Sequence, residues 1–211
     1  MLERKLPMAE RRRCGLELPW TWQQCLAIVV ILIDAVSFGR IIAPLTRMWW
    51  LDALFYLAWI VVSASGILLM IKDPADPQPE IWPEDAAFCL HCNMPALQTM
   101  KHCHQCNKCV DNFDHHCNWL NTCICNQNYA LFICLICSLL GMLTLFLIGG
   151  SLAILSCERS KAHLVVVGIA VPNLCVWVLD AMLLGVHIFL HIKGITTYEL
   201  ILRMRKQPSS W

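Results

Sequence analysis

The hydrophobic positions of this chain fall into four long runs, without the short amphipathic segments of a soluble fold. The runs cover residues 22–45, 49–71, 130–155 and 164–192. A helix needs about 20 mainly apolar residues to cross roughly 30 Å of hydrocarbon, because it rises 1.5 Å per residue. All four runs reach this length, and the third contains no charged residue. The pattern therefore predicts four transmembrane helices.

Composition supports this reading of the pattern. Of the 211 residues, 58% are hydrophobic and 15% are charged, whereas a soluble domain carries roughly 25% charged residues. The net charge of +1 argues against a nucleic-acid partner, which usually requires a basic domain. The first run is too long for a signal peptide and lacks a small-residue cleavage site. We therefore expect an all-α integral membrane protein that retains its first helix.

The distribution of Lys and Arg predicts the orientation of the helices. Five lie before the first run, three lie between residues 72 and 129, and four follow the fourth run. The opposite side holds four, which are Arg40, Arg47, Arg159 and Lys161. Because Lys and Arg accumulate on the cytoplasmic side, both termini and the segment 72–129 are predicted to be cytoplasmic.

The predicted spans divide the chain into four parts. Residues 1–71 form a cytoplasmic N-terminus and two helices, and residues 72–129 form a cytoplasmic cysteine-rich domain. Residues 130–192 form the third and fourth helices, and residues 193–211 form a cytoplasmic C-terminal segment. Four prolines (Pro74, Pro77, Pro79 and Pro83) predict an extended linker at the start of the second part, since proline does not fit inside a helix. No internal repeat is expected.

The cysteine-rich part has the composition of a metal site. Eight of the 14 cysteines and five of the eight histidines lie between Cys89 and Cys125. Two cysteines separated by two residues can bind one tetrahedral zinc ion, and this spacing occurs at 89/92, 103/106 and 106/109. An extracellular location would instead favour disulfides. A cytoplasmic location favours structural zinc, whose binding would supply folding free energy.

The number of potential ligands suggests two zinc ions and leaves one group of residues over. Eight candidates are enough for two closed sites: Cys89, Cys92, His102, Cys103, Cys106, Cys109, His116 and Cys123. The remaining Asp114, His115 and Cys117 could form a catalytic group, in which a carboxylate orients an imidazole that deprotonates a thiol. The spacing alone does not decide which of His115 and His116 binds metal.

At these residues the sequence resembles the DHHC family of membrane protein S-acyltransferases, also called protein palmitoyltransferases. The similarity runs from Asp73-Pro74 to the Thr196-Thr197-Tyr198-Glu199 segment, and its most specific part is residues 102–132. The resemblance implies a cytoplasmic zinc-bound domain between the second and third of four membrane helices. It also implies that the protein is an enzyme that transfers a fatty acyl group from acyl-CoA to protein cysteines.

The resemblance also assigns residue roles. Two structural Zn²⁺ ions would be bound by Cys89, Cys92, His102 and Cys109, and by Cys103, Cys106, His116 and Cys123. Cys117 would be the acylated nucleophile, His115 its general base and Asp114 the residue that polarises His115. Thr197, assigned to the cofactor-binding side of the site, would help to hold Asp114. The implied partners are acyl-CoA (palmitoyl-CoA), the lipid bilayer and cytoplasmic cysteines of membrane-associated proteins, at the Golgi, the endoplasmic reticulum or the plasma membrane.

Two rival functions remain open from the sequence. The chain departs from the family pattern at Thr99, Asn118 and Cys125, which favours a membrane-anchored zinc scaffold or adaptor with weak catalysis. Asp34 and Asp180 lie within predicted spans, where acidic residues are candidates for ion relays in transporters. The competing interpretation is that they hydrogen-bond within the protein and fix helix packing. Cysteines in the predicted spans are expected to be small packing residues; these are Cys134, Cys137 and Cys175.

Overall fold

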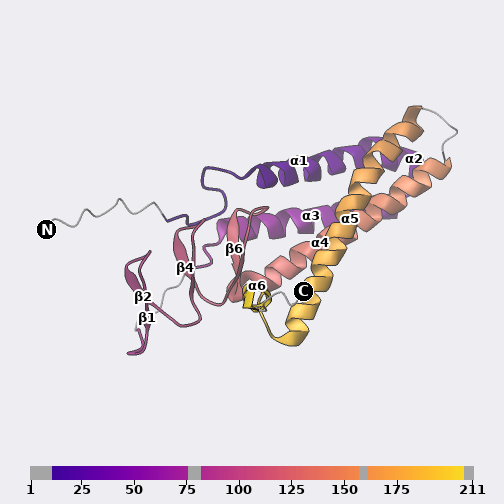
Figure 1. The fold of residues 1–211 in the computed structure, drawn as a ribbon. Coiled ribbons are helices and arrows are strands. Elements are labelled where there is room, and N and C mark those ends of the chain that lie inside the picture. Colours follow the sequence, from indigo (N-terminus) through magenta and orange to yellow (C-terminus); the bar gives the residue numbers. More distant parts are fainter. Residues whose placement is uncertain (1–10, 76–81, 157–160, 207–211) are drawn as a thin grey trace. The chain divides into compact units, whose positions relative to one another are not determined.

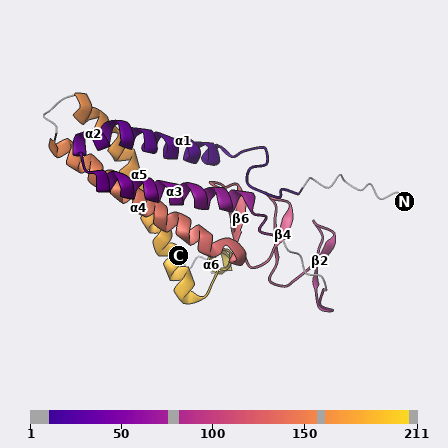
Figure 2. The same ribbon diagram turned by 180° about the vertical axis from the view of Figure 1, so that it is seen from behind.

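The computed structural model describes residues 11–75, 82–156 and 161–206, which form two compact units. One unit consists of long helices (Figures 1 and 2). These helices are α1 (Trp22–Ser37), α3 (Trp49–Ile71), α4 (Asn126–Ser156) and α5 (Lys161–Lys193). A π-helical turn η1 (Phe38–Ile42) and the short α2 (Ala43–Thr46) extend α1. Four segments are long and apolar enough to cross a membrane: Trp22–Thr46, Trp49–Ile71, Asn126–Ser156 and His163–Lys193. The prediction of four membrane helices is confirmed.

Aromatic residues form the core of the helical unit. The rings of Phe38 and Phe55 stack with centroids 3.8 Å apart, and the ring of Phe146 lies 6.1 Å from each of them. Between 17% and 33% of the most apolar window of each span is buried within the protein. Most apolar side chains of the spans therefore face outward, which is stable in lipid and would be unfavourable in water.

Polar contacts inside the helical unit favour a packing role for Asp34, one of the two acids in the predicted spans. Asp34 is 2% exposed and accepts a hydrogen bond of 3.0 Å from the side-chain amide of Asn173. Trp177 donates to the hydroxyl of Thr144 at 2.9 Å. Hydrogen bonds between helices stabilise their packing in membranes. The contact of Asp34 therefore supports the interpretation that it fixes helix packing.

The cysteines of the helical unit differ from the expectation. Cys134, Cys137 and Cys175 are exposed, so the prediction that they are packing residues between the helices is wrong. In a membrane helix a small apolar thiol is stable against lipid as well as against protein, so an apolar sequence does not decide which way it faces.

The second unit contains three antiparallel β-hairpins and one short helix. The hairpins are β1 (Ala87–Cys89) with β2 (Met94–Ala96), β3 (Lys101–Cys103) with β4 (Lys108–Val110), and β5 (Phe113–Cys117) with β6 (Thr122–Cys125). The helix is α6 (Thr197–Lys206). Pro77 and Pro79 of the predicted linker lie outside the described residues.

One turn recurs in all three hairpins at intervals of 14 residues. The first strand ends at Cys89, Cys103 and Cys117, and an asparagine precedes each second strand. These residues, Asn93, Asn107 and Asn121, have positive φ angles of 52°, 48° and 53°. Asparagine tolerates this left-handed conformation better than most residues. The expectation that the chain has no internal repeat is therefore wrong. The repeat is limited to a few positions that recur every 14 residues.

The repeat also includes the residue pairs that face each other across the two strands of a hairpin. His102 pairs with Cys109 in the second hairpin, and His116 pairs with Cys123 in the third. The corresponding pair in the first hairpin is Phe88 with Pro95. The second cysteine of the turn, Cys92 or Cys106, is replaced in the third hairpin by Leu120. The second hairpin thus has both pairs of potential ligands, and each outer hairpin has one.

Candidate active site and metal centres

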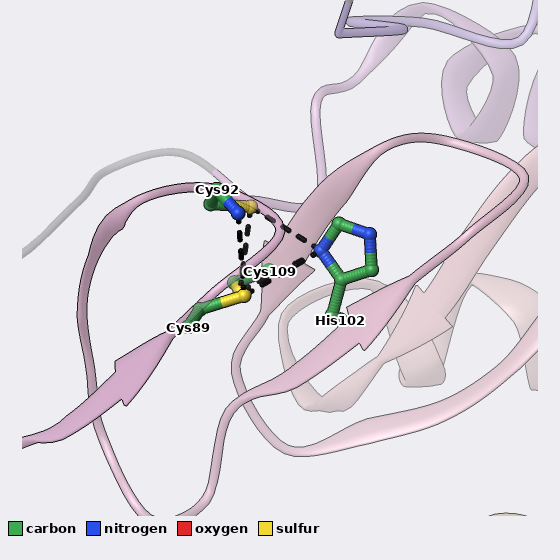
Figure 3. Close-up of side chains that lie close together, drawn as sticks. All are labelled: Cys89, Cys92, His102 and Cys109. Atoms are coloured by element: carbon green, nitrogen blue, oxygen red, sulfur yellow. Dashed lines mark hydrogen bonds between the residues drawn. The ribbon is translucent and has the colours of Figure 1, made fainter. Parts of the chain in front are cut away.

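The first cluster joins the turn of hairpin one to the strands of hairpin two. Nδ1 of His102 lies 3.8 Å from the sulfur of Cys89, 3.2 Å from that of Cys92 and 4.0 Å from that of Cys109. The sulfurs of Cys92 and Cys109 are 3.6 Å apart. Figure 3 shows Nδ1 of His102 turned toward the three sulfurs.

The second cluster repeats this arrangement one hairpin further along. Nδ1 of His116 lies 3.6 Å from Cys103, 3.3 Å from Cys106 and 3.8 Å from Cys123, measured to their sulfurs. The sulfurs of Cys106 and Cys123 are 3.5 Å apart. The structure thus brings together the same two groups of four residues that the resemblance implies.

Both clusters fit zinc. With Zn–S bonds of about 2.3 Å and Zn–N bonds of about 2.0–2.1 Å, neighbouring ligand atoms of a tetrahedral ion lie roughly 3.5–3.8 Å apart. The separations of 3.2 to 4.0 Å in the first cluster and 3.3 to 3.8 Å in the second lie around these values. All cysteines among the described residues are free. Three thiols and one imidazole form a donor set that suits Zn²⁺ and not Ca²⁺ or Mg²⁺.

Two further histidines lie beside the first cluster. The rings of His91 and His104 have their centroids 4.7 and 5.0 Å from that of His102, and 4.9 Å from each other. Both side chains are exposed. Because His102 already faces three sulfurs through Nδ1, this group overlaps the first cluster and does not form an independent site.

The alternation of side chains along β5 separates the two adjacent histidines. Successive residues of a strand point to opposite faces. His116 lies with the second cluster, whereas His115 and Cys117, two residues apart, share the other face. An irregularity in the pairing between Phe113 and His115 leaves Asp114 without a partner in β6. Such a bulge can redirect a side chain, and the carboxylate of Asp114 accepts a 2.7 Å hydrogen bond from Nδ1 of His115.

A second contact holds Asp114 from a distant part of the chain. At the start of α6, the backbone N–H of Thr197 donates to Oδ1 of Asp114 at 2.8 Å, and its hydroxyl donates to Oδ2 at 2.8 Å. The rings of Phe113 and Tyr198 make an edge contact, with centroids 5.9 Å apart. Asp114 is 4% exposed, so these hydrogen bonds replace the water that a buried carboxylate loses.

The pKa values of His115 and Asp114 reflect the hydrogen bonds that these side chains make. Burial tends to lower the pKa of His115, but hydrogen bonds with Asp114 and Cys117 raise it to about 9. Burial tends to raise the pKa of Asp114, but hydrogen bonds from His115 and Thr197 bring it below its ordinary value. Nδ1 of His115 must carry a proton because a carboxylate can only accept. Nε2 is then the ring nitrogen available to Cys117, and the raised pKa of His115 favours the state in which Nε2 holds the proton of this thiol.

The positions that depart from the family pattern do not interrupt these contacts. Thr99 donates to Asp111 at 2.5 Å, outside the two clusters and the Cys117 group. Cys125 is fully buried, its sulfur lies 3.6 Å from the carbonyl oxygen of Pro74, and burial raises its pKa. The carbonyl of Asn118 accepts a hydrogen bond of 2.5 Å from Thr21.

Two features of this unit were missed by the sequence reasoning. Lys108 is 2% exposed and its ammonium lies 2.7 Å from the carboxylate of Asp73. Residues 11–21 contact the turns of the second and third hairpins. The repeated asparagines could have revealed the hairpins, but nothing in the sequence pairs residues 11–21 with turns about 100 positions away.

The fold and the site define a class of protein: a multi-pass membrane protein with a Cys/His domain that can hold two zinc ions and carries a further thiol beside a histidine. Comparison with known families gives the same result, since the DHHC palmitoyltransferase model matches residues 83–204. The chain belongs to the DHHC palmitoyltransferase family.

Curated relatives agree with this assignment. The chain is 36% identical over 145 residues to "Probable protein S-acyltransferase 20" of Arabidopsis thaliana, covering 58% of this chain and 20% of that protein. It is 26% identical over 263 aligned positions to "Palmitoyltransferase ZDHHC11" of Homo sapiens, covering 97% and 63%. "Probable palmitoyltransferase ZDHHC11B" of Homo sapiens is 31% identical over 156 residues, covering 58% and 42%. The chain thus spans from one fifth to just under two thirds of the length of these relatives.

Proposed function

We propose that this protein is a protein S-acyltransferase that moves a fatty acyl group from acyl-CoA, through a thioester on Cys117, to cysteines of membrane-proximal proteins. The observation that carries the proposal is the thiol–imidazole–carboxylate series of Cys117, His115 and Asp114 on β5, with the three hydrogen-bonded in sequence. None of the three belongs to either metal cluster.

The reaction proceeds by two thioester exchanges. In the first, Cys117 gives its proton to Nε2 of His115, and its sulfur attacks the acyl carbonyl carbon. A new carbon–sulfur bond forms, the bond to the CoA sulfur breaks, and CoA leaves as the thiol with the proton from His115. In the second, the sulfur of a substrate cysteine displaces Cys117 in the same way, and the proton returns to Cys117 through His115. Splitting one transfer into two steps is typical of covalent catalysis.

The roles of the supporting residues follow from their contacts. Asp114 keeps the ring of His115 in the tautomer that leaves Nε2 as the acceptor and stabilises the imidazolium that forms. Thr197 donates two hydrogen bonds to Asp114 and so fixes the carboxylate that orients the base. Its assignment to the cofactor-binding side remains a prediction.

The two zinc ions have a structural role in this proposal. Each cluster provides four protein ligands, which closes the tetrahedral shell and leaves no position for substrate. Binding of metal to such small domains is coupled to folding and contributes on the order of 10 kcal/mol per site. The ions would keep the three short hairpins folded while β5 carries the reaction.

The orientation and the substrates belong to the same proposal. The excess of Lys and Arg supports a cytoplasmic location for both termini and for the cysteine-rich domain. The membrane would be that of the Golgi, the endoplasmic reticulum or the plasma membrane. The fatty chain can stay among apolar helices while its thioester reaches the cytoplasmic interface. The acceptors are therefore cytoplasmic cysteines of proteins that already lie at the membrane.

The test is the formation of the Cys117 thioester. Purified protein in detergent is incubated with alkyne-tagged palmitoyl-CoA, and the label is quantified before and after neutral hydroxylamine, which cleaves thioesters. We expect hydroxylamine-sensitive label in the wild type and none in Cys117→Ser. A wild-type protein that binds two zinc ions and takes up no label would contradict the proposal and support the scaffold alternative.

A further inference from the structure

The third hairpin differs from the other two in how its turn is held. The turns of the first and second hairpins each supply a pair of cysteines to a metal cluster, Cys89 with Cys92 and Cys103 with Cys106. The third turn has Cys117 at the first position and Leu120 at the second. It therefore cannot offer two ligands to a metal ion, although it carries the reacting thiol.

An N-terminal segment holds the third turn through hydrogen bonds to its backbone and to one of its side chains. Residues 11–21, which we call the strap, contact the third turn on both sides of its tip. The hydroxyl of Thr21 donates to the carbonyl of Asn118, the residue after Cys117, at 2.5 Å. The buried amide of Asn121 donates to the carbonyls of Gly15 and Pro19 at 3.3 and 3.2 Å.

Gly15 allows the strap to approach the turn this closely. A Cβ atom at this position would lie 2.2 Å from the carbonyl oxygen of Leu120 and 3.3 Å from Cα of Met70. The N–H of Gly15 donates to the carbonyl of Met70 at 2.6 Å. Because the nearest atoms belong to the backbone, any larger residue would have to displace the strap or the turn.

The strap is also anchored to the second hairpin. The N–H of Arg12 donates to the carbonyl of Cys106 at 3.0 Å. The buried ammonium of Lys108 donates to the carbonyl of Arg13 at 3.2 Å and to Asp73 at 2.7 Å, and Arg11 donates to the same carboxylate at 2.8 Å. The strap thus connects a turn that carries metal ligands to the turn that carries the nucleophile.

From these contacts we infer that the strap is a positioning element for Cys117, which replaces in the third turn the metal ion that holds the other two turns. The inference rests on the proposed function and extends it to residues 11–21, which lie outside the segment 83–204 matched by the family model. A displacement of about 1 Å between reacting groups can slow a reaction about 10²-fold. The strap residues therefore act on the rate of acylation without touching the substrate.

Three variants test this inference. Thr21→Val removes the hydroxyl with little change in shape, Thr21→Ser keeps it, and Gly15→Ala introduces the Cβ that would meet the backbone. Thr46→Val is the matched control, because the Thr46 hydroxyl also donates to a backbone carbonyl, that of Ala43, at 3.4 Å, but belongs to the helical unit. Each variant is measured for zinc content, for the self-acylation rate as a function of palmitoyl-CoA concentration, and for the rate of Cys117 alkylation by iodoacetamide.

At saturating palmitoyl-CoA, we expect the self-acylation rate of Thr21→Val to be about 10-fold below that of the wild type, because one hydrogen bond is lost. The rate of Gly15→Ala should be about 10²-fold lower, because the turn is displaced. Both variants should keep two zinc ions and the wild-type KM for palmitoyl-CoA. The rate at which iodoacetamide alkylates Cys117 should differ from that of the wild type in both variants. Thr21→Ser and Thr46→Val should match the wild type.

Wild-type rates in both Thr21→Val and Gly15→Ala would overturn the inference, as would a loss of zinc in proportion to the loss of rate. Because alkylation needs no acyl-CoA, it tests the strap even if the wild type takes up no label. A wild-type protein without label would contradict the proposed function, whereas normal label in every variant would contradict only the role of the strap.

Discussion

The adjacent histidines of β5 should respond in opposite ways to the same substitution. Nδ1 of His116 lies 3.3 to 3.8 Å from three sulfurs, whereas Nδ1 of His115 lies 2.7 Å from the carboxylate of Asp114. His116→Ala therefore removes one of four metal ligands. His115→Ala removes the proposed base and leaves all eight potential ligands in place.

Loss of a metal ligand and loss of a general base have different consequences, and these consequences also differ in size. Zinc binding in small domains is worth on the order of 10 kcal/mol and is coupled to folding, so His116→Ala should release about one zinc ion per chain and expose the hairpins to protease. A general base typically contributes 10²–10⁴-fold to the rate. His115→Ala should therefore acylate about 10²–10⁴-fold more slowly while keeping two zinc ions and a protected domain.

Three measurements on both variants in parallel distinguish a metal ligand from a general base. They are the zinc content by elemental analysis, the sensitivity to limited proteolysis and the rate of labelling by palmitoyl-CoA. His115→Gln, which retains a polar side chain of similar length, is a control for general disturbance of β5 and should also retain zinc. Loss of zinc in His115→Ala with retention in His116→Ala would refute the assignment. Equal loss in both variants would show that neither histidine is available as a base for Cys117.

Three further predictions follow from the structure. Cys117→Ser should abolish self-acylation and keep two zinc ions; normal label in this variant would identify another thiol as the nucleophile. Leu120→Cys completes a Cys-x2-Cys turn, so mild oxidation should block acylation of this variant but not of the wild type, and reductant should restore acylation. Insensitivity of the variant to oxidation would show that the third turn does not repeat the geometry of the other two. Protease added to sealed, cytoplasmic-side-out vesicles should cleave after Lys101 once zinc is chelated, whereas protection of this site would reverse the proposed orientation.

Local patterns in the sequence predict the membrane architecture and the chemistry available to the cysteine-rich domain. Four apolar runs predict four spans because the thickness of the bilayer imposes a minimum length that few soluble segments reach. The density of Cys and His, with repeated two-residue spacing, predicts a zinc-type site because a short turn places two thiolates within reach of one ion. Both predictions depend on local properties of the chain, which a sequence records directly.

The division of those residues among their tasks depends on tertiary contacts. The spacing left open which of His115 and His116 binds metal, and the alternation of side chains along β5 separates them. Thr197 reaches Asp114 across 83 positions, and Gly15 reaches the Asn121 amide across 106. Such contacts depend on how hairpins, helix and strap pack together, and a composition or a spacing contains no information about packing partners that are distant in the chain. For the same physical reason, the sequence and its resemblance to the family indicate Cys117 as the proposed nucleophile but do not indicate the strap that contacts its turn.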